Sequence, residues 1–204
     1  MKKSKTPPKK PELITVPAEE ILKLPDEGGA IDYIELFKSI IEGHSNNPKW
    51  AKGRLIGIKT LANTKVGDVG QDFIEALCEA LKIPIIFPAN KKNQRSKRSP
   101  WDLKLQKITF ELKTATEDTG GNFQFNHIRY HREYQAVLCL GVSPDGLFFN
   151  IYSKADIATG KSGRLVSMEK GANASYKLTK SKNQLLPLDQ FEERLKEVVE
   201  SIIS

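Results

Sequence analysis

Apolar residues along the chain recur with two different periods, and the changes between them predict a series of helices and strands. Between residues 30 and 42, isoleucine and phenylalanine recur every three or four positions, which is typical of an amphipathic helix. The same period predicts a helix over 71–82, after Gly67 and Gly70, and a C-terminal helix that begins near Leu188. Short apolar or β-branched runs predict strands at 83–87, 108–115, 136–142 and 147–152.

This order of elements predicts an α/β protein with a central mixed β-sheet flanked by helices. Residues 136–142 are almost uniformly apolar, as expected of a central strand that is covered on both faces. The length of 204 residues favours a single domain over 13–204, preceded by a basic disordered arm at 1–12. We interpret residues 122–135 as a strand end passing into a short helix, and 159–182 as exposed irregular loops.

The composition indicates a soluble globular protein, with 39% hydrophobic and 28% charged residues. No apolar run approaches the length of a membrane span, and the basic N-terminus is not followed by the apolar segment of a secretory signal. We therefore expect a cytoplasmic location. Cys78 and Cys139 lie inside apolar segments without the spacing of a zinc site, so both are predicted to be buried thiols.

Residues 99–116 predict a β-hairpin that carries ionisable side chains. A turn is expected at 104–107, with Asp102 before it and a strand rich in β-branched residues after it. Side chains alternate between the two faces of a strand, so Glu111 and Lys113 are neighbours on one face. A hairpin of this length brings Asp102 opposite that pair, so two carboxylates and an ammonium group converge on one patch.

The chemistry of this patch points to a divalent metal. Asp102 and Glu111 would repel each other unless a positive charge lay between them, and hard carboxylate oxygens suit Mg²⁺ better than Zn²⁺. Lys113 lies where it could orient a water molecule beside such an ion. The opposite face of the strand, with Phe110 and Leu112, is expected to be buried in the core.

The positive charge of the chain is concentrated in two segments. The net charge is +7, and residues 1–10 and 91–98 each hold five cations and no acid, so the remainder carries −3. Concentrated cations favour a polyanionic partner such as DNA. The second segment ends directly before the hairpin, where it would deliver a phosphate backbone to the acidic patch. The predicted DNA-binding residues are Lys91, Lys92, Arg95, Lys97, Arg98, Arg129, Arg132 and Lys170.

The hairpin resembles the signature of the PD-(D/E)XK nuclease superfamily, with Pro100, Asp102, Glu111 and Lys113 at the matching positions. Trp101 departs from the pattern, because the family's proline and aspartate are often adjacent. The resemblance covers roughly residues 65–155. It implies a restriction-endonuclease-like core, a Mg²⁺ ion held by Asp102 and Glu111, and a lysine, Lys113, that holds or activates the attacking water.

Further site residues follow only from this resemblance. The main-chain carbonyl of Leu112 is expected as another metal ligand. Family members commonly bring one more acid from the helix before the hairpin, in a Gly-x-x-aromatic-x-Glu setting that Gly70, Phe73 and Glu75 resemble. We assign that role to Glu75, with Asp72 as the alternative.

The sequence therefore predicts a Mg²⁺-dependent endodeoxyribonuclease acting on double-stranded DNA, most similar to type II restriction endonucleases. By resemblance it would leave 5′-phosphate and 3′-hydroxyl ends, act as a homodimer, and accompany a DNA methyltransferase that acts on the same site. A junction resolvase or a repair nicking enzyme could use the same residues. A non-catalytic nucleic-acid-binding protein, with the ionisable residues forming a salt-bridge cluster, and an RNA-directed factor are the alternatives outside the nuclease class.

Overall fold

The computed structural model describes residues 31–44, 54–90, 95–96, 99–118, 120–144 and 146–204. Residues 31–204 form one compact unit. The predicted arm at 1–12 lies outside the described residues, so the proposed boundary at residue 13 stays a prediction.

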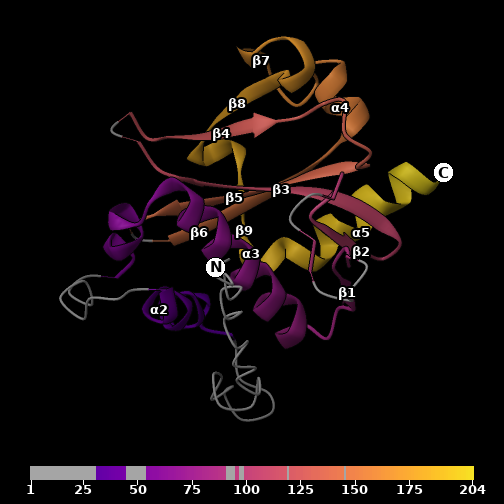
Figure 1. Ribbon diagram of the computed structural model, residues 1–204. Coiled ribbons are helices and arrows are strands. Elements are labelled where there is room, and N and C mark those ends of the chain that lie inside the picture. Colours follow the sequence, from indigo (N-terminus) through magenta and orange to yellow (C-terminus); the bar gives the residue numbers. More distant parts are fainter. Residues whose placement is uncertain (1–30, 45–53, 91–94, 97–98, 119, 145) are drawn as a thin grey trace, which may run out of the picture. The chain divides into compact units, whose positions relative to one another are not determined.

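In the described part of the chain, six strands form a central sheet in the order β1-β2-β3-β5-β6-β9 (Figure 1). β3 and β5 are parallel, whereas the other neighbouring pairs are antiparallel. The expected α/β class with a central mixed sheet is therefore confirmed. The strand bounds are β1 Ile85–Ile86, β2 Leu103–Leu105, β3 Ile108–Thr116, β5 Ala136–Ser143, β6 Gly146–Ser153 and β9 Leu186–Pro187.

Helices α2, α3 and α5 cover one face of this sheet, whereas α4 lies on the opposite face, where its Ile157 packs between the two sheets. Phe37 and Phe73 join α2 to α3 with ring centroids 4.8 Å apart, and Phe191 of α5 packs 5.1 Å from Phe149 of β6. The helices are α2 Tyr33–His44, α3 Asn63–Ala80, α4 Lys154–Ala158 and α5 Phe191–Ile203, with short 3₁₀ turns η2 Ile56–Thr60, η3 Gly171–Asn173, η4 Lys182–Gln184 and η5 Leu188–Gln190.

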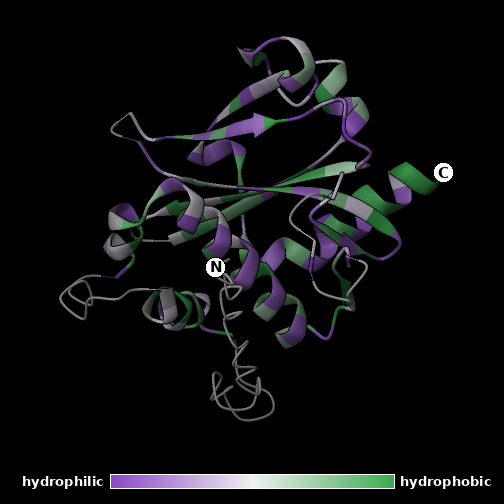
Figure 2. Ribbon diagram, viewed as in Figure 1, coloured by the Kyte–Doolittle hydropathy of each residue, from purple (hydrophilic) through white to green (hydrophobic). Residues whose placement is uncertain are grey.

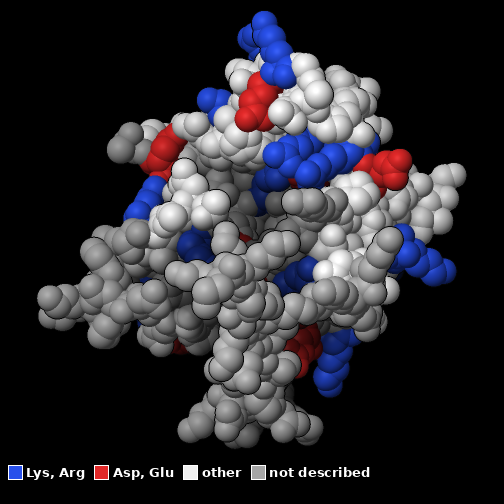
Figure 3. All heavy atoms as spheres, viewed as in Figure 1, with Lys and Arg blue, Asp and Glu red and all other residues white. Residues whose placement is uncertain are grey.

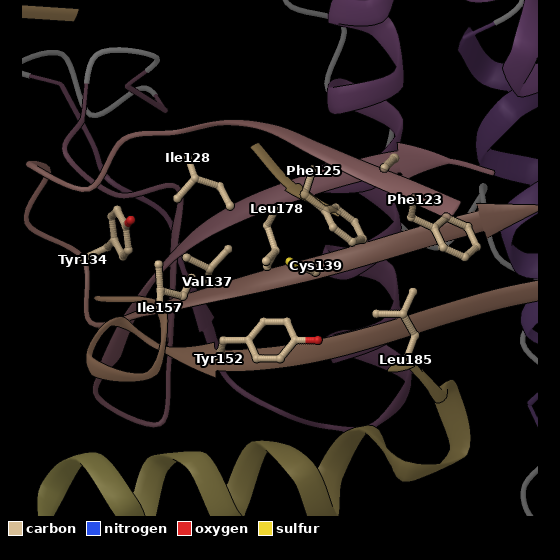
Figure 4. Close-up of a cluster of buried hydrophobic side chains, with 11 residues drawn as sticks. Phe123, Phe125, Ile128, Tyr134, Val137, Cys139, Tyr152, Ile157, Leu178 and Leu185 are labelled. Carbon is tan, nitrogen blue, oxygen red and sulfur yellow. The ribbon is translucent and has the colours of Figure 1, made fainter. Parts of the chain in front are cut away.

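A second sheet covers the opposite face. Its order is β4-β8-β7, with bounds Asn122–Ile128, Ser175–Ser181 and Leu165–Glu169. Phe123, Phe125 and Leu178 point from it toward Val137 and Cys139 of the central sheet, as Figure 4 shows. All five side chains are fully buried, so this cluster forms the core between the two sheets.

The second sheet corrects two sequence predictions. Residues 122–128 form a strand and no helix follows them before β5 in the described chain, so the predicted short helix is wrong. Residues 165–181 form the hairpin of β7 and β8 rather than irregular loops. The alternation of buried Phe123 and Phe125 with exposed Gln124 is the period of a half-buried strand.

The helix before the hairpin is longer than predicted, because α3 begins at Asn63 and contains both Gly67 and Gly70. Gly70 lies against β3, where a Cβ atom would lie 1.8 Å from Oγ1 of Thr114. The glycine therefore permits close helix–sheet packing instead of ending the helix. This contact fixes α3 on the face of β3 that carries Phe110, Leu112 and Thr114.

The distribution of hydropathy follows these layers. Every residue of β5 is buried, and the inner strands β5 and β6 are coloured mainly as hydrophobic in Figure 2. The predicted central strand at 136–142 is thus confirmed. None of the helices in the described ranges is long and apolar enough to cross a membrane.

The two glycines of α3 provide a matched test of this packing. Gly70→Ala should lower the free energy of unfolding by about 1–3 kcal/mol, because its methyl group would overlap Thr114. Gly67→Ala should instead raise it by about 0.5–1 kcal/mol, since nothing lies within 4 Å of the added atom and alanine favours a helix. Urea unfolding of both variants checks the prediction, and equal effects would contradict it.

Candidate active site

The candidate site is centred on β3, whose two faces carry different chemistry. Phe110 and Leu112 are buried toward the helices, as predicted. Glu111 and Lys113 face the second sheet, and Lys113 Nζ lies 2.6 Å from Glu111 Oε1. The Lys113 side chain is 19% exposed and that of Glu111 only 1%, so the carboxylate is deeper than its partner.

Asp102 is held against β3 by the polypeptide backbone. Its Oδ2 accepts a hydrogen bond from the Leu112 N–H at 2.8 Å, and its own N–H donates to the Phe110 carbonyl at 2.8 Å. β2 begins only at Leu103, so no backbone carbonyl of β2 lies opposite Leu112. The Asp102 carboxylate accepts the hydrogen bond of the Leu112 N–H instead. The hairpin thus fixes the carboxylate rather than leaving it on a free loop.

The turn that sets this register lies within the predicted range 104–107 and is limited to its last two residues, because β2 extends to Leu105. It consists of Gln106 and Lys107, which both have positive φ, at 44° and 76°. Two such residues are typical of a type I′ turn, which matches the twist of the strands it joins. The register pairs Leu103 with Phe110, so the next pair outward aligns Asp102 with Glu111.

The Glu111 carboxyl has an unusual electrostatic environment. Burial raises its pKa, and the Asp102 carboxylate adds to that effect, while Lys113 and Arg132 oppose it. Glu111 Oε2 is buried and makes no hydrogen bond within the described residues. A buried carboxylate oxygen without a donor is costly, so this atom has capacity for a further positive partner.

Arg132 approaches the same carboxylate from the loop between β4 and β5. Its Nη1 lies 4.0 Å from Glu111 Oε2 and donates to the Ser99 carbonyl at 3.4 Å. Lys154 Nζ, at the start of α4, donates to the Arg132 carbonyl at 2.6 Å and so holds the β4–β5 loop in place. The sequence assigned Arg132 to DNA contact, and the structure places it beside the carboxylates.

Tyr134 is a residue of this site that sequence reasoning missed. Its hydroxyl is buried without a hydrogen-bond partner in the described chain. Burial and the Glu111 carboxylate both raise the pKa of the hydroxyl, which keeps it protonated. Residues 122–135 predict a strand end followed by a short helix, a pattern that does not indicate that Tyr134 lies near Glu111.

Glu75, the predicted third acid, is engaged elsewhere. Its Oε2 lies 2.7 Å from Arg95 Nη2, and the Arg95 guanidinium stacks 3.3 Å above the centre of the Phe87 ring. Glu75 is also absent from the charges that shift the Glu111 pKa. Its role, and that of the alternative Asp72, stays a prediction.

The remaining predicted DNA-binding residues are scattered. Lys91, Lys92, Lys97 and Arg98 lie outside the described residues, whereas Arg129 precedes the β4–β5 turn and Lys170 is exposed after β7. Blue Lys and Arg side chains gather over the part of the molecule formed by β4, β7 and β8 on the face seen in Figure 3. Any electrostatic contact with DNA therefore stays a prediction for these positions.

The donor set fits Mg²⁺ in one specific way. No three His, Cys, Asp or Glu residues in the described ranges gather into a metal cluster, but Mg²⁺ is commonly held by one or two carboxylates, with waters and substrate phosphates completing its shell. Asp102 and Glu111 supply two carboxylates, and Glu111 Oε2 makes no hydrogen bond in the described chain, with Arg132 no nearer than 4.0 Å. The N–H and C=O groups of one strand residue point to the same side of the strand. Because the Leu112 N–H donates to Asp102, the Leu112 carbonyl also points toward the Asp102 side of β3.

Comparisons with known proteins add little to this geometry. No protein-family model matches the sequence, and no curated protein matches it. Among solved structures, the bacterial homing endonuclease I-Ssp6803I is similar, with a TM-score of 0.40 and 10% sequence identity over 60% of this chain and 80% of that chain. A similarity of this size identifies neither a family nor an activity, so the function below rests on the residues of the site.

The raised pKa of Glu111 predicts how stability depends on pH. Because the fold favours the protonated form, this group contributes most stability below its unfolded pKa, and the contribution is lost as pH rises through the folded pKa. Glu111→Gln should therefore unfold at a higher urea concentration than the wild type at neutral pH, because glutamine resembles the protonated form that the fold favours. The difference should vanish in acid.

Urea unfolding across a pH series measures this difference. Glu133→Gln, an exposed carboxylate on the neighbouring loop, is the matched control and should change little. If Glu111→Gln lost stability increasingly toward neutral pH, the ion pair with Lys113 would outweigh the cost of burial.

Proposed function

We propose that this chain is a Mg²⁺-dependent endodeoxyribonuclease that hydrolyses phosphodiester bonds in double-stranded DNA. The observation that carries the proposal is the alignment of Asp102 with Glu111 on a rigid hairpin, with Lys113 2.6 Å from a carboxylate whose second oxygen has no hydrogen bond. An ordinary salt-bridge cluster would satisfy both oxygens of a buried carboxylate. This one leaves capacity for a cation.

Asp102, Glu111 and the Leu112 carbonyl would hold the ion. When bound, Mg²⁺ supplies Lewis-acid stabilisation of the negative charge that builds on the phosphate oxygens. The backbone hydrogen bond from Leu112 to Asp102 keeps that carboxylate in place before substrate arrives. Such preorganisation limits the rearrangement needed during the reaction.

Lys113 and Arg132 provide the positive charge that belongs to the chain itself. In the structure they balance the two carboxylates, at 2.6 Å and 4.0 Å from Glu111. Once a cation neutralises the carboxylates, both side chains can turn to anionic substrate. Lys113, partly exposed on the same face, orients the attacking water, and Arg132 contacts the scissile phosphate. Hydrolysis adds water across the P–O3′ bond and leaves 5′-phosphate and 3′-hydroxyl ends.

The finer proposal is a site-specific enzyme of the type II restriction kind within the PD-(D/E)XK superfamily. What supports it is the Asp102, Glu111 and Lys113 spacing together with the mixed sheet that carries it. Cutting both strands of a palindrome would be simplest for a two-fold homodimer. A DNA methyltransferase acting on the same site would then protect the host.

Digestion of a mixed-sequence plasmid tests the activity. In Mg²⁺ the wild type should produce discrete fragments, and EDTA should abolish them. Asp102→Ala should be inactive, and Lys113→Ala should cleave at least about 10²-fold more slowly, because it lacks the cation that orients the water. Lys104→Ala, which removes the same charge from the neighbouring strand β2, should cleave normally.

Several outcomes would change the conclusion. Cleavage that persists in Asp102→Ala would place the activity elsewhere. Intact plasmid with retained DNA binding would favour a non-catalytic binding protein, and cleavage confined to branched DNA would favour a junction resolvase. Nicked circles alone would favour a repair nicking enzyme.

A further inference from the structure

A cavity lies beside β6, and β5 separates it from the strand β3 that carries Glu111. Its volume is about 630 Å³, and it is bounded by β6, α4 with its following turn, β8 and α5. In the central sheet β5 separates β3, which carries Glu111, from β6, which carries the cavity residue Tyr152. Its lining includes Tyr152, Asp156, Ser162, Lys180, Arg194 and Glu197.

Lys180 is the unusual member of this lining. It lies in β8 opposite Phe123, on the inner face of the second sheet where its neighbours are apolar, and only 6% of the residue is exposed. Its Nζ lies 5.0 Å from the centre of the Tyr152 ring. Within the described residues the ammonium group makes neither an ion pair nor a hydrogen bond.

The carboxylates around the cavity already have other partners. Asp156 Oδ1 lies 3.5 Å from Lys161 Nζ, and Glu197 Oε2 lies 2.9 Å from Arg194 Nη1. Arg194 also donates to the Ile151 carbonyl at 2.9 Å, which fixes it in place. Lys180 therefore contributes a positive charge that the lining does not neutralise. Burial lowers its pKa, as expected of an ammonium group without an acid beside it.

A second polar group at the same cavity also lacks a partner. Ser162 is 3% exposed, and its hydroxyl makes no hydrogen bond in the described chain. The next residue, Gly163, has φ of +110°, and a Cβ atom there would lie 3.1 Å from Lys180 Nζ. The turn after α4 thus brings its backbone directly against the lysine, with Ser162 adjacent.

We propose that this cavity binds a small phosphate-bearing molecule, with the Lys180 ammonium as the principal cation and the Ser162 hydroxyl as a further donor. Buried ammonium groups in proteins are normally paired, and a bound anion would supply the missing partner of Lys180. The volume of the cavity falls within the range of small-molecule sites. The site is separate from the proposed nuclease centre and does not depend on it.

The number of hydrogen-bond donors favours phosphate over a single carboxylate, since the charges of Lys161, Lys180 and Arg194 exceed those of Asp156 and Glu197 by only one. Lysine binds phosphate as a compact point charge with three donors. The Lys161 side chain is 81% exposed, and its pair with Asp156 is an open surface contact that contributes little. Lys161 can therefore turn from Asp156 toward a bound phosphate, which then contacts the ammonium groups of Lys161 and Lys180. Arg194 keeps its bonds to Glu197 and the Ile151 carbonyl.

Isothermal titration calorimetry and thermal unfolding of the full chain test this site, with inorganic phosphate, a nucleoside 5′-monophosphate and the matching nucleoside as probes. The wild type should bind inorganic phosphate and the nucleoside monophosphate, and each should raise its unfolding temperature. The nucleoside alone should not bind. Binding of inorganic phosphate would show that the anion alone suffices. Tighter binding of the nucleotide would show that the cavity also holds the remainder of the molecule.

Lys180→Met keeps the apolar stem and removes the charge, so it should weaken phosphate binding at least tenfold. Without phosphate it should unfold at a temperature no lower than that of the wild type, because it removes a charge that burial disfavours. Lys177→Met, on the outward face of the same strand where Lys177 contacts Gln124, is the matched control and should bind like the wild type. Ser162→Ala should weaken binding with little effect on folding.

Two results would overturn the proposal. One is a wild type that binds neither phosphate in large excess, and the other is equal binding by the wild type and Lys180→Met. Because none of these measurements involves DNA, a negative result leaves the proposed nuclease activity unaffected, and loss of plasmid cleavage in the earlier test leaves this site unaffected.

Discussion

The burial of one carboxylate, Glu111, in the middle of β3 is the constraint on which the candidate site depends. A charge at that depth is tolerated only because Lys113 and Arg132 stand beside it, and even then burial raises its pKa. Even with both cations beside it, the fold favours the uncharged, protonated form of this carboxyl group. The site is therefore a place where the fold gives up stability, as functional sites commonly do.

The layers on either side of β3 explain how the charge is accommodated. Gly70 lets α3 pack closely on one face, and this leaves the polar side chains of β3 to the other face. There Arg132, from the β4–β5 loop, lies 4.0 Å from the Glu111 carboxylate, and the buried hydroxyl of Tyr134 comes from the same loop. The same pair of sheets encloses the Lys180 side chain on the opposite side of β5.

The sequence indicated the parts of the fold that depend on local pattern. The strand at 136–142 was recognisable because it is apolar on both faces, and Glu111 and Lys113 because their spacing places them on one face. The turn was predicted only as the range 104–107, since neither Gln106 nor Lys107 is the glycine or asparagine that normally marks positive φ.

The parts that depend on tertiary contact could not be read in this way. β7 has four exposed residues out of five, so it carries no apolar period, and it is a strand only because β8 pairs with it. The pairing of Glu75 with Arg95 joins residues twenty positions apart and cannot be inferred from either segment. The unpaired Lys180 likewise looks like any surface lysine until β8 is placed against the central sheet.

Titration of Mn²⁺ into the wild type and Asp102→Asn, with and without duplex DNA, tests the central claim that the two carboxylates form a metal site. Asparagine keeps an oxygen that can accept the Leu112 hydrogen bond, so the hairpin should stay intact while one anionic ligand is lost. The account predicts saturable binding in the wild type that is at least tenfold weaker in the variant. Equal affinity in the two proteins, or no binding to the wild type even with DNA, would contradict it.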